Sequence, residues 1–132
     1  MAPPDNGPAY HTHDYVEAFM PVSGQWRFYW GNDPDGEPEG EAVVGPLDWI
    51  SLPPGLWRGF ENISDQDAWI VAVLENHDLF ASKDPYWSQK VVDQAAQYGF
   101  MADERGKMVK PGTYDSLRQQ VEDALLHKAS TK

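Results

Sequence analysis

Residues 11–24 read HTHDYVEAFMPVSG, and this stretch decides how the rest of the chain is interpreted. Its residues His11, His13 and Glu17 all have odd numbers. An extended strand would therefore place the three side chains on one face. Two imidazoles and a carboxylate on one face suit a first-row divalent metal such as Fe, Mn, Ni or Zn, and they leave coordination positions open. The stretch predicts a metal site on a β-strand, with Tyr15 and Phe19 beside it.

Short apolar stretches separated by Gly, Pro and Asp fill residues 15–75, a pattern typical of an all-β barrel or sandwich. We expect strands at Val16–Val22, Gln25–Trp30, Glu41–Val44, Asp48–Leu52, Trp57–Asn62 and Ala68–Leu74. Ser23-Gly24 is predicted to join the first two as a tight turn. Seven large aromatic residues are expected in the core: Trp26, Phe28, Trp30, Trp49, Trp57, Phe60 and Trp69.

After Glu75 the apolar period becomes helical. Asp84-Pro85 is interpreted as an N-cap followed by the first helical residue, and Gly99 as the helix end. A second helix is predicted from about Tyr114 to Lys128. We expect one domain, with a barrel over residues 1–80 and a helical extension over 81–132 packed on it. A dimer contact is the alternative role of the helical faces.

Composition limits the class of partner. The 132 residues suit one domain, and 21 acidic against 10 basic residues give a formal net charge of −11. This charge argues against nucleic acid and anionic membranes as partners. No apolar run has the length of a membrane span, residues 1–10 do not read as a signal peptide, and cysteine is absent. We therefore expect a cytoplasmic protein.

Two spaced motifs resemble those of the cupin superfamily. Its first motif is H-x-H, three or four residues, E, six residues, G, and this chain matches it with His11, His13, Glu17 and Gly24. Its second motif is G, five residues, P-x-G, two residues, H, three residues, N, and here the matching positions are Leu47, Pro53-Pro54-Gly55, Arg58 and Asn62. The resemblance covers residues 11 to about 75 and implies a jelly-roll β-barrel, here followed by two helices.

The departures from the second motif concern Leu47 and Arg58. Leu47 replaces its opening glycine, and Arg58 replaces the histidine that is the family's fourth metal ligand. Arginine offers no lone pair, so three ligands remain. Arg58 could bind an anionic substrate group, pair with Glu17 in a metal-free pocket, or face solvent. We favour the first outcome, because both histidines and Glu17 are retained.

The resemblance implies a metal-dependent enzyme, with a dioxygenase the most frequent type and a lyase or isomerase also open. The alternative is a binding cupin without catalysis. We predict Glu17 and Arg58 as catalytic residues, and substrate contacts from Arg58, Tyr15, Phe19 and Phe60. His77 is interpreted as a surface residue. Only ten residues precede His11, whereas cupins usually place one or more strands there, so either the barrel is incomplete, or a partner subunit supplies strands, or the sequence begins late. An exposed edge left by missing strands would be an association site, and we therefore expect a homodimer.

Overall fold

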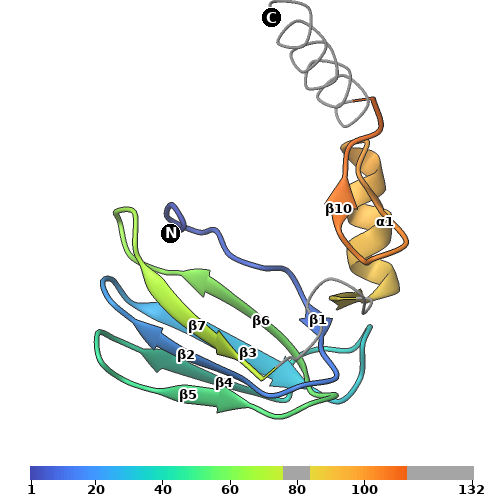
Figure 1. Cartoon of the computed structure of the whole chain (residues 1–132). Coiled ribbons are helices and arrows are strands. Elements are labelled where there is room, and N and C mark those ends of the chain that lie inside the picture. Colours follow the sequence, from blue (N-terminus) through green and yellow to red (C-terminus); the bar gives the residue numbers. More distant parts are fainter. Residues whose placement is uncertain (76–83, 113–132) are drawn as a thin grey trace, which may run out of the picture.

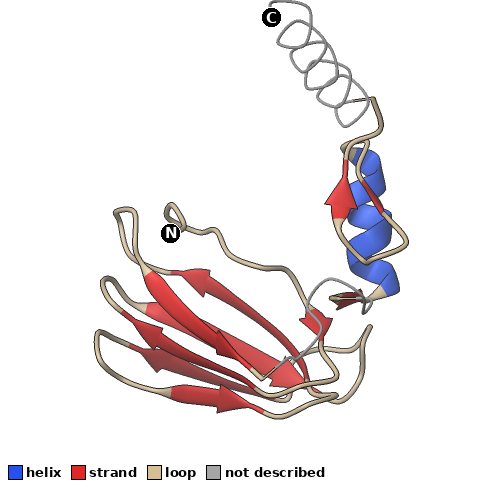
Figure 2. Cartoon of the chain, viewed as in Figure 1, coloured by secondary structure: helices blue, strands red, loops and turns tan. Residues whose placement is uncertain are grey.

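The computed structural model describes residues 1–75 and 84–112. The two larger of their three antiparallel sheets stack face to face (Figure 1; Figure 2). The five-stranded sheet has the order β4-β3-β6-β1-β8. Its strands are β4 (Gly40–Val44), β3 (Trp26–Gly31), β6 (Trp57–Asn62), β1 (His11–Thr12) and β8 (Tyr86–Trp87). The three-stranded sheet has the order β5-β2-β7. Its strands are β5 (Ile50–Leu52), β2 (Glu17–Pro21) and β7 (Ile70–Leu74).

The hydrophobic core lies between the two sheets. Phe28 of β3 stacks on Phe60 of β6 with ring centroids 4.8 Å apart, and Phe19 of β2 meets Phe60 at 4.6 Å. Trp26, Leu52 and Ala68 complete the buried cluster. In β2 every second residue is buried, as the period-two pattern predicts. The all-β fold class and the six predicted strands are confirmed.

The predicted hairpin at Ser23-Gly24 is wrong. Gly24 has a positive φ of 73° and turns the chain, but β2 and β3 belong to different sheets. The step between them is a corner of the barrel. A similar corner lies at residues 13–16, between β1 and β2, so residues 11–19 are not one strand. The predicted metal ligands therefore come from two facing sheets.

The helix start predicted at Asp84-Pro85 is also wrong. Strand β8 follows this pair, and α1 (Gln89–Gln97) begins only after Ser88, whose side chain accepts a hydrogen bond from the Val91 N–H. The helix ends close to the predicted position, with Gly99 at a φ of 80°. A hairpin of β9 (Met101–Ala102) and β10 (Met108–Val109) follows. The second predicted helix lies outside the described residues.

Helix α1 lies beside one end of the barrel, near β1 and β8 (Figure 1). Its first turn reaches the 32–40 loop, where the Lys90 N–H donates to Asp35 Oδ1 at 3.1 Å. None of its side chains is fully buried. In the described part of the chain, no helix has the length and apolar character needed to cross a membrane.

Candidate metal centre

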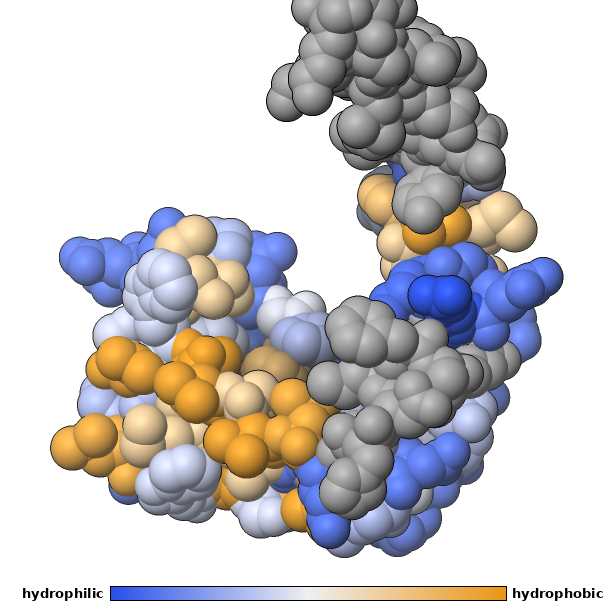
Figure 3. All heavy atoms as spheres, viewed as in Figure 1, coloured by the Kyte–Doolittle hydropathy of each residue, from blue (hydrophilic) through white to orange (hydrophobic). Residues whose placement is uncertain are grey.

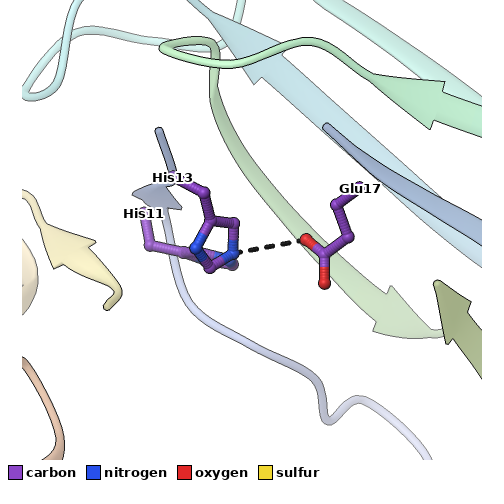
Figure 4. A group of neighbouring side chains, drawn as sticks. All are labelled: His11, His13 and Glu17. Atoms are coloured by element: carbon purple, nitrogen blue, oxygen red, sulfur yellow. Dashed lines mark hydrogen bonds and ion pairs between the residues drawn. The ribbon is translucent and has the colours of Figure 1, made fainter. Parts of the chain in front are cut away.

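Three buried polar side chains meet between the two sheets (Figure 4). His11 comes from β1, His13 from the corner that follows, and Glu17 from the start of β2. Their nearest ligand atoms all lie within 4.8 Å of one another. His11 Nε2 and His13 Nε2 are 3.1 Å apart, and His13 Nε2 is 3.3 Å from Glu17 Oε2. The structure thus brings together the three residues predicted as metal ligands.

The hydrogen bonds on the far side of both imidazoles determine what faces the centre. His11 Nδ1 lies 2.6 Å from the carbonyl oxygen of Ala9, and His13 Nδ1 lies against the carboxylate of Asp84. Both partners only accept hydrogen bonds, so we assign the imidazole proton to Nδ1 in each case. Each neutral ring then turns the lone pair of its Nε2 toward Glu17. Three lone-pair donors converge with no proton among them, and a bound cation removes their mutual repulsion.

Burial also favours the neutral form of His11. Desolvation lowers the pKa of His11 from 6.5 to about 4, although the hydrogen bond to Ala9 opposes this shift. Electrostatic interactions with His13 and with the charged Arg58 lower the pKa further. The imidazole is therefore neutral near pH 7, which is the form that binds a metal.

Asp84 is a residue of the site that the motif comparison does not reveal. One carboxylate oxygen accepts from His13, and the other accepts from the Tyr15 hydroxyl at 2.6 Å. Burial alone would raise the pKa of Asp84, but the Tyr15 hydrogen bond and the interactions with His13 lower it overall. The Tyr15 ring stacks on the His13 ring with centroids 4.8 Å apart. Asp84 and Tyr15 thus fix the orientation of one predicted ligand.

Arg58 points into the barrel, which excludes the solvent-facing outcome. It lies on β6 opposite His11, is fully buried, and places Nη2 at 3.7 Å from Glu17 Oε2. Nη1 donates to the Leu56 carbonyl at 2.9 Å. Within the described residues, Nε and Nη2 have no hydrogen-bond partner. Burial lowers the pKa of Arg58 and Glu17 opposes the shift, but a guanidinium keeps its charge at any ordinary pH.

Solved structures with the same architecture were found by comparison. The Drosophila melanogaster CENP-C cupin domain aligns with a TM-score of 0.50 and 11% identity over 56% of each chain. The capsular polysaccharide assembling protein CapF from Staphylococcus aureus aligns with a TM-score of 0.57 and 24% identity over 65% of this chain. An oxalate oxidase aligns with a TM-score of 0.50 and 20% identity over 72% of this chain. The chain has the cupin fold.

The likeness to these cupins concerns the fold alone, because all identities are low. No family model matches the sequence, and no curated protein matches it. The chain spans 56% of the CENP-C cupin domain, 52% of the oxalate oxidase and 24% of CapF.

The second cupin motif has a physical explanation in this structure. Gly55 has a φ of 76°, and Leu47, at the position of the motif's opening glycine, keeps a φ of 73°. The left-handed backbone that favours glycine is therefore present although the residue is leucine. Asn62 accepts from the Ser64 N–H and donates to the carbonyls of Ala2 and Gln66. Of these positions Gly55 adjoins the site, because its N–H donates to the His13 carbonyl at 2.8 Å.

The remaining predicted site residues differ in whether they contact the metal centre. Tyr15 contacts the centre through His13 and Asp84, whereas Phe19 and Phe60 belong to the core cluster. A substrate contact from either phenylalanine stays a prediction. His77 lies outside the described residues. Two of the aromatic residues expected in the core are exposed instead, since Trp49 and Trp69 are 61% and 58% accessible.

Proposed function

We propose that this cupin is a metal-dependent oxidoreductase of the dioxygenase type that acts on a small organic carboxylate. The convergence of three lone-pair donors from His11, His13 and Glu17 carries the proposal. Two histidines and one carboxylate with open positions are the ligand set of non-haem iron oxygenases. A redox-active metal held there would supply the activation of O2. Manganese, nickel and zinc also fit these donors, and zinc would supply Lewis acidity alone.

Arg58 supports the choice of a carboxylate as the substrate group. Its unpartnered Nε and Nη2 atoms are neighbours on one edge of the guanidinium. That edge binds the two oxygens of a carboxylate through parallel hydrogen bonds. A buried cation with two of its three nitrogens unpartnered is costly, and an anionic substrate group beside the metal would satisfy those two nitrogens. We propose that Arg58 binds and orients the substrate, while Glu17 is a metal ligand.

A second candidate function follows from the contact between Arg58 and Glu17. Their 3.7 Å separation allows an ion pair, and an ion pair would occupy the carboxylate without a metal. In that case the chain would be a cupin that binds a small molecule and catalyses no reaction. A metal-dependent lyase or isomerase would use the same three ligands. We prefer the redox reaction because two histidines and one carboxylate are the ligand set of non-haem iron oxygenases.

Metal loading tests the proposal. Purified protein incubated with Fe²⁺, Mn²⁺, Ni²⁺ or Zn²⁺ and then desalted is expected to retain about one ion per chain by elemental analysis. His11→Ala and His13→Ala should lose it, and Arg27→Gln, an exposed arginine far from the centre, should keep it. The iron form should consume O2 with a substrate among catechols, flavonols, diketones and small carboxylates. Retention of less than about a tenth of an ion per chain would overturn the metal centre.

The cell compartment and partner class belong to the same proposal. We propose a cytoplasmic enzyme of a small molecule, supported by the absence of cysteine and the net charge of −11. Such a charge repels nucleic acid.

A further inference from the structure

The outer faces of the two sheets differ sharply in charge. On the five-stranded sheet, Arg27 of β3 pairs with Glu41 of β4 at 2.7 Å and with Glu61 of β6 at 3.1 Å. The same guanidinium lies over the Tyr29 ring at 5.5 Å. Charged residues paired across strands are what a sheet face exposed to water carries. The outer face of the five-stranded sheet therefore has the composition of a surface exposed to water.

On the outer face of the three-stranded sheet, the described strands present no charged side chain. Glu17 and Phe19 of β2 point inward, so Ala18 and Met20 point outward, where they pair with Val73 and Val71 of β7. The face extends along β2 and across to β5. We define the apolar sheet face as Ala18, Met20, Val22, Trp49, Trp69, Val71 and Val73. Figure 3 shows hydrophobic side chains gathered over this sheet.

Exposure of this face to water is unfavourable. Val22, Trp49, Trp69 and Val73 are each more than half accessible, and Val71 is 41% accessible. Monomeric soluble proteins rarely leave a contiguous apolar patch of this kind uncovered, and such patches mark interaction sites. Within the described strands β2, β5 and β7 the single acidic residue is Glu17, and it points inward. The contrast with the opposite sheet indicates a surface that is buried against a partner.

We propose that the partner is a second copy of this chain, and that two apolar sheet faces stack on each other. Two copies with a net charge of −11 repel each other, so they associate best through a face without charge. A basic partner would instead be recognised by acidic residues, which this face lacks. Two identical flat sheets related by a twofold axis are self-complementary and pack as in a β-sandwich. This inference does not rest on the proposed function.

Lysine substitutions at opposite edges of the face test this dimer. Val73→Lys on β7 and Trp49→Lys beside β5 each place a charge in the stacked interface, where an unpaired charge is strongly unfavourable. Val43→Lys is the matched control, because Val43 is 55% accessible and pairs with Arg27 on the outer face of the other sheet. Sedimentation velocity at about 1–100 μM is expected to show a dimer for the wild type and Val43→Lys. Both other variants should sediment as monomers, with far-UV circular dichroism unchanged.

Several results would overturn the stacked dimer. A wild type that stays monomeric over this concentration range would show that another molecule, or another segment of the same chain, covers the face. Dissociation by Val43→Lys to the same extent would place the contact on the charged sheet or attribute it to net charge. Dissociation by Val73→Lys but not by Trp49→Lys would indicate pairing along the edge of β7 instead of stacking. If a lysine variant loses its β-sheet spectrum, Val73→Ser and Trp49→Ser replace the pair in the same measurement.

Discussion

Substitution of Asp84 tests the imidazole orientation on which the metal centre depends. Asp84 accepts from His13 Nδ1 with one oxygen and from the Tyr15 hydroxyl with the other. Asp84→Ala removes both acceptors and leaves the His13 ring free to change its tautomer and tilt. Loss of such an outer partner typically costs about 10- to 100-fold in metal affinity. This range corresponds to about 1.4–2.7 kcal/mol.

The substitutions Asp84→Asn and Asp84→Ala should lower the metal affinity to different extents. In Asp84→Asn the amide oxygen still accepts from His13 Nδ1–H, but the negative charge that polarises the imidazole is lost. We expect Asp84→Asn near the tenfold end of the range and Asp84→Ala near the 100-fold end. Asp14→Asn removes an equal charge from an exposed neighbour of His13 and should change the affinity by less than about threefold.

The assay is a chelator competition titration with Zn²⁺, supported by the absorption spectrum of the Co²⁺ form. A change in ligand geometry shifts the Co²⁺ bands, whereas a loss of fold stability alone leaves them unchanged. The midpoint of urea unfolding is measured in parallel to separate the two effects. Equal Zn²⁺ affinity in the wild type and both Asp84 variants would refute the assigned role of Asp84. A 100-fold loss in Asp14→Asn would attribute the effect to general charge.

Three further predictions concern Arg58 and His11. Arg58→His adds a fourth ligand and removes a positive charge, so the Zn²⁺ affinity should rise by about tenfold or more. An unchanged Zn²⁺ affinity would contradict the position of Arg58 at the centre. Arg58→Met removes the positive charge beside the buried Glu17 carboxylate, so the free energy of unfolding of the metal-free protein measured in urea should fall by about 3–5 kcal/mol, while binding of small carboxylates is lost. For His11, the pKa is lowered to about 4 in the folded chain, so the unfolded chain binds more protons between pH 4 and 6.5. The free energy of unfolding of the metal-free protein should therefore keep this contribution above pH 6.5 and fall by about 3 kcal/mol as the pH drops to 4. An equal fall in the free energy of unfolding of His11→Gln, measured in urea over the same pH range, would contradict this assignment.

The strands and the three ligands could be predicted because both depend on local patterns. Alternation of apolar residues identifies β3 and β6, and the spacing of His11, His13 and Glu17 matches a motif. The reason given for their convergence was nevertheless wrong. A single strand would have held all three on one face, whereas the corner between β1 and β2 brings them together from facing sheets.

Asp84 and the exposed tryptophans could not be predicted, because each depends on contacts distant in sequence. Asp84 lies 71 residues from His13, and an Asp-Pro pair before a helical pattern has the local appearance of a helix cap. Alternation places Trp49 and Trp69 on a face of a strand, but it does not say whether another sheet covers that face. Burial of a strand is set by the tertiary packing of its two sides.

The position of the centre between the sheets links metal binding to the barrel itself. His11 belongs to the five-stranded sheet, Glu17 to the three-stranded sheet, and Asp84 to the segment that leads into β8. Without a cation, the buried Glu17 and Arg58 keep polar atoms unsatisfied within the described residues. These groups oppose folding, since an unpartnered buried polar group costs about 1–3 kcal/mol. A metal on Glu17 and an anion on Arg58 would satisfy both groups, so the ligands that complete the site would also hold the two sheets together.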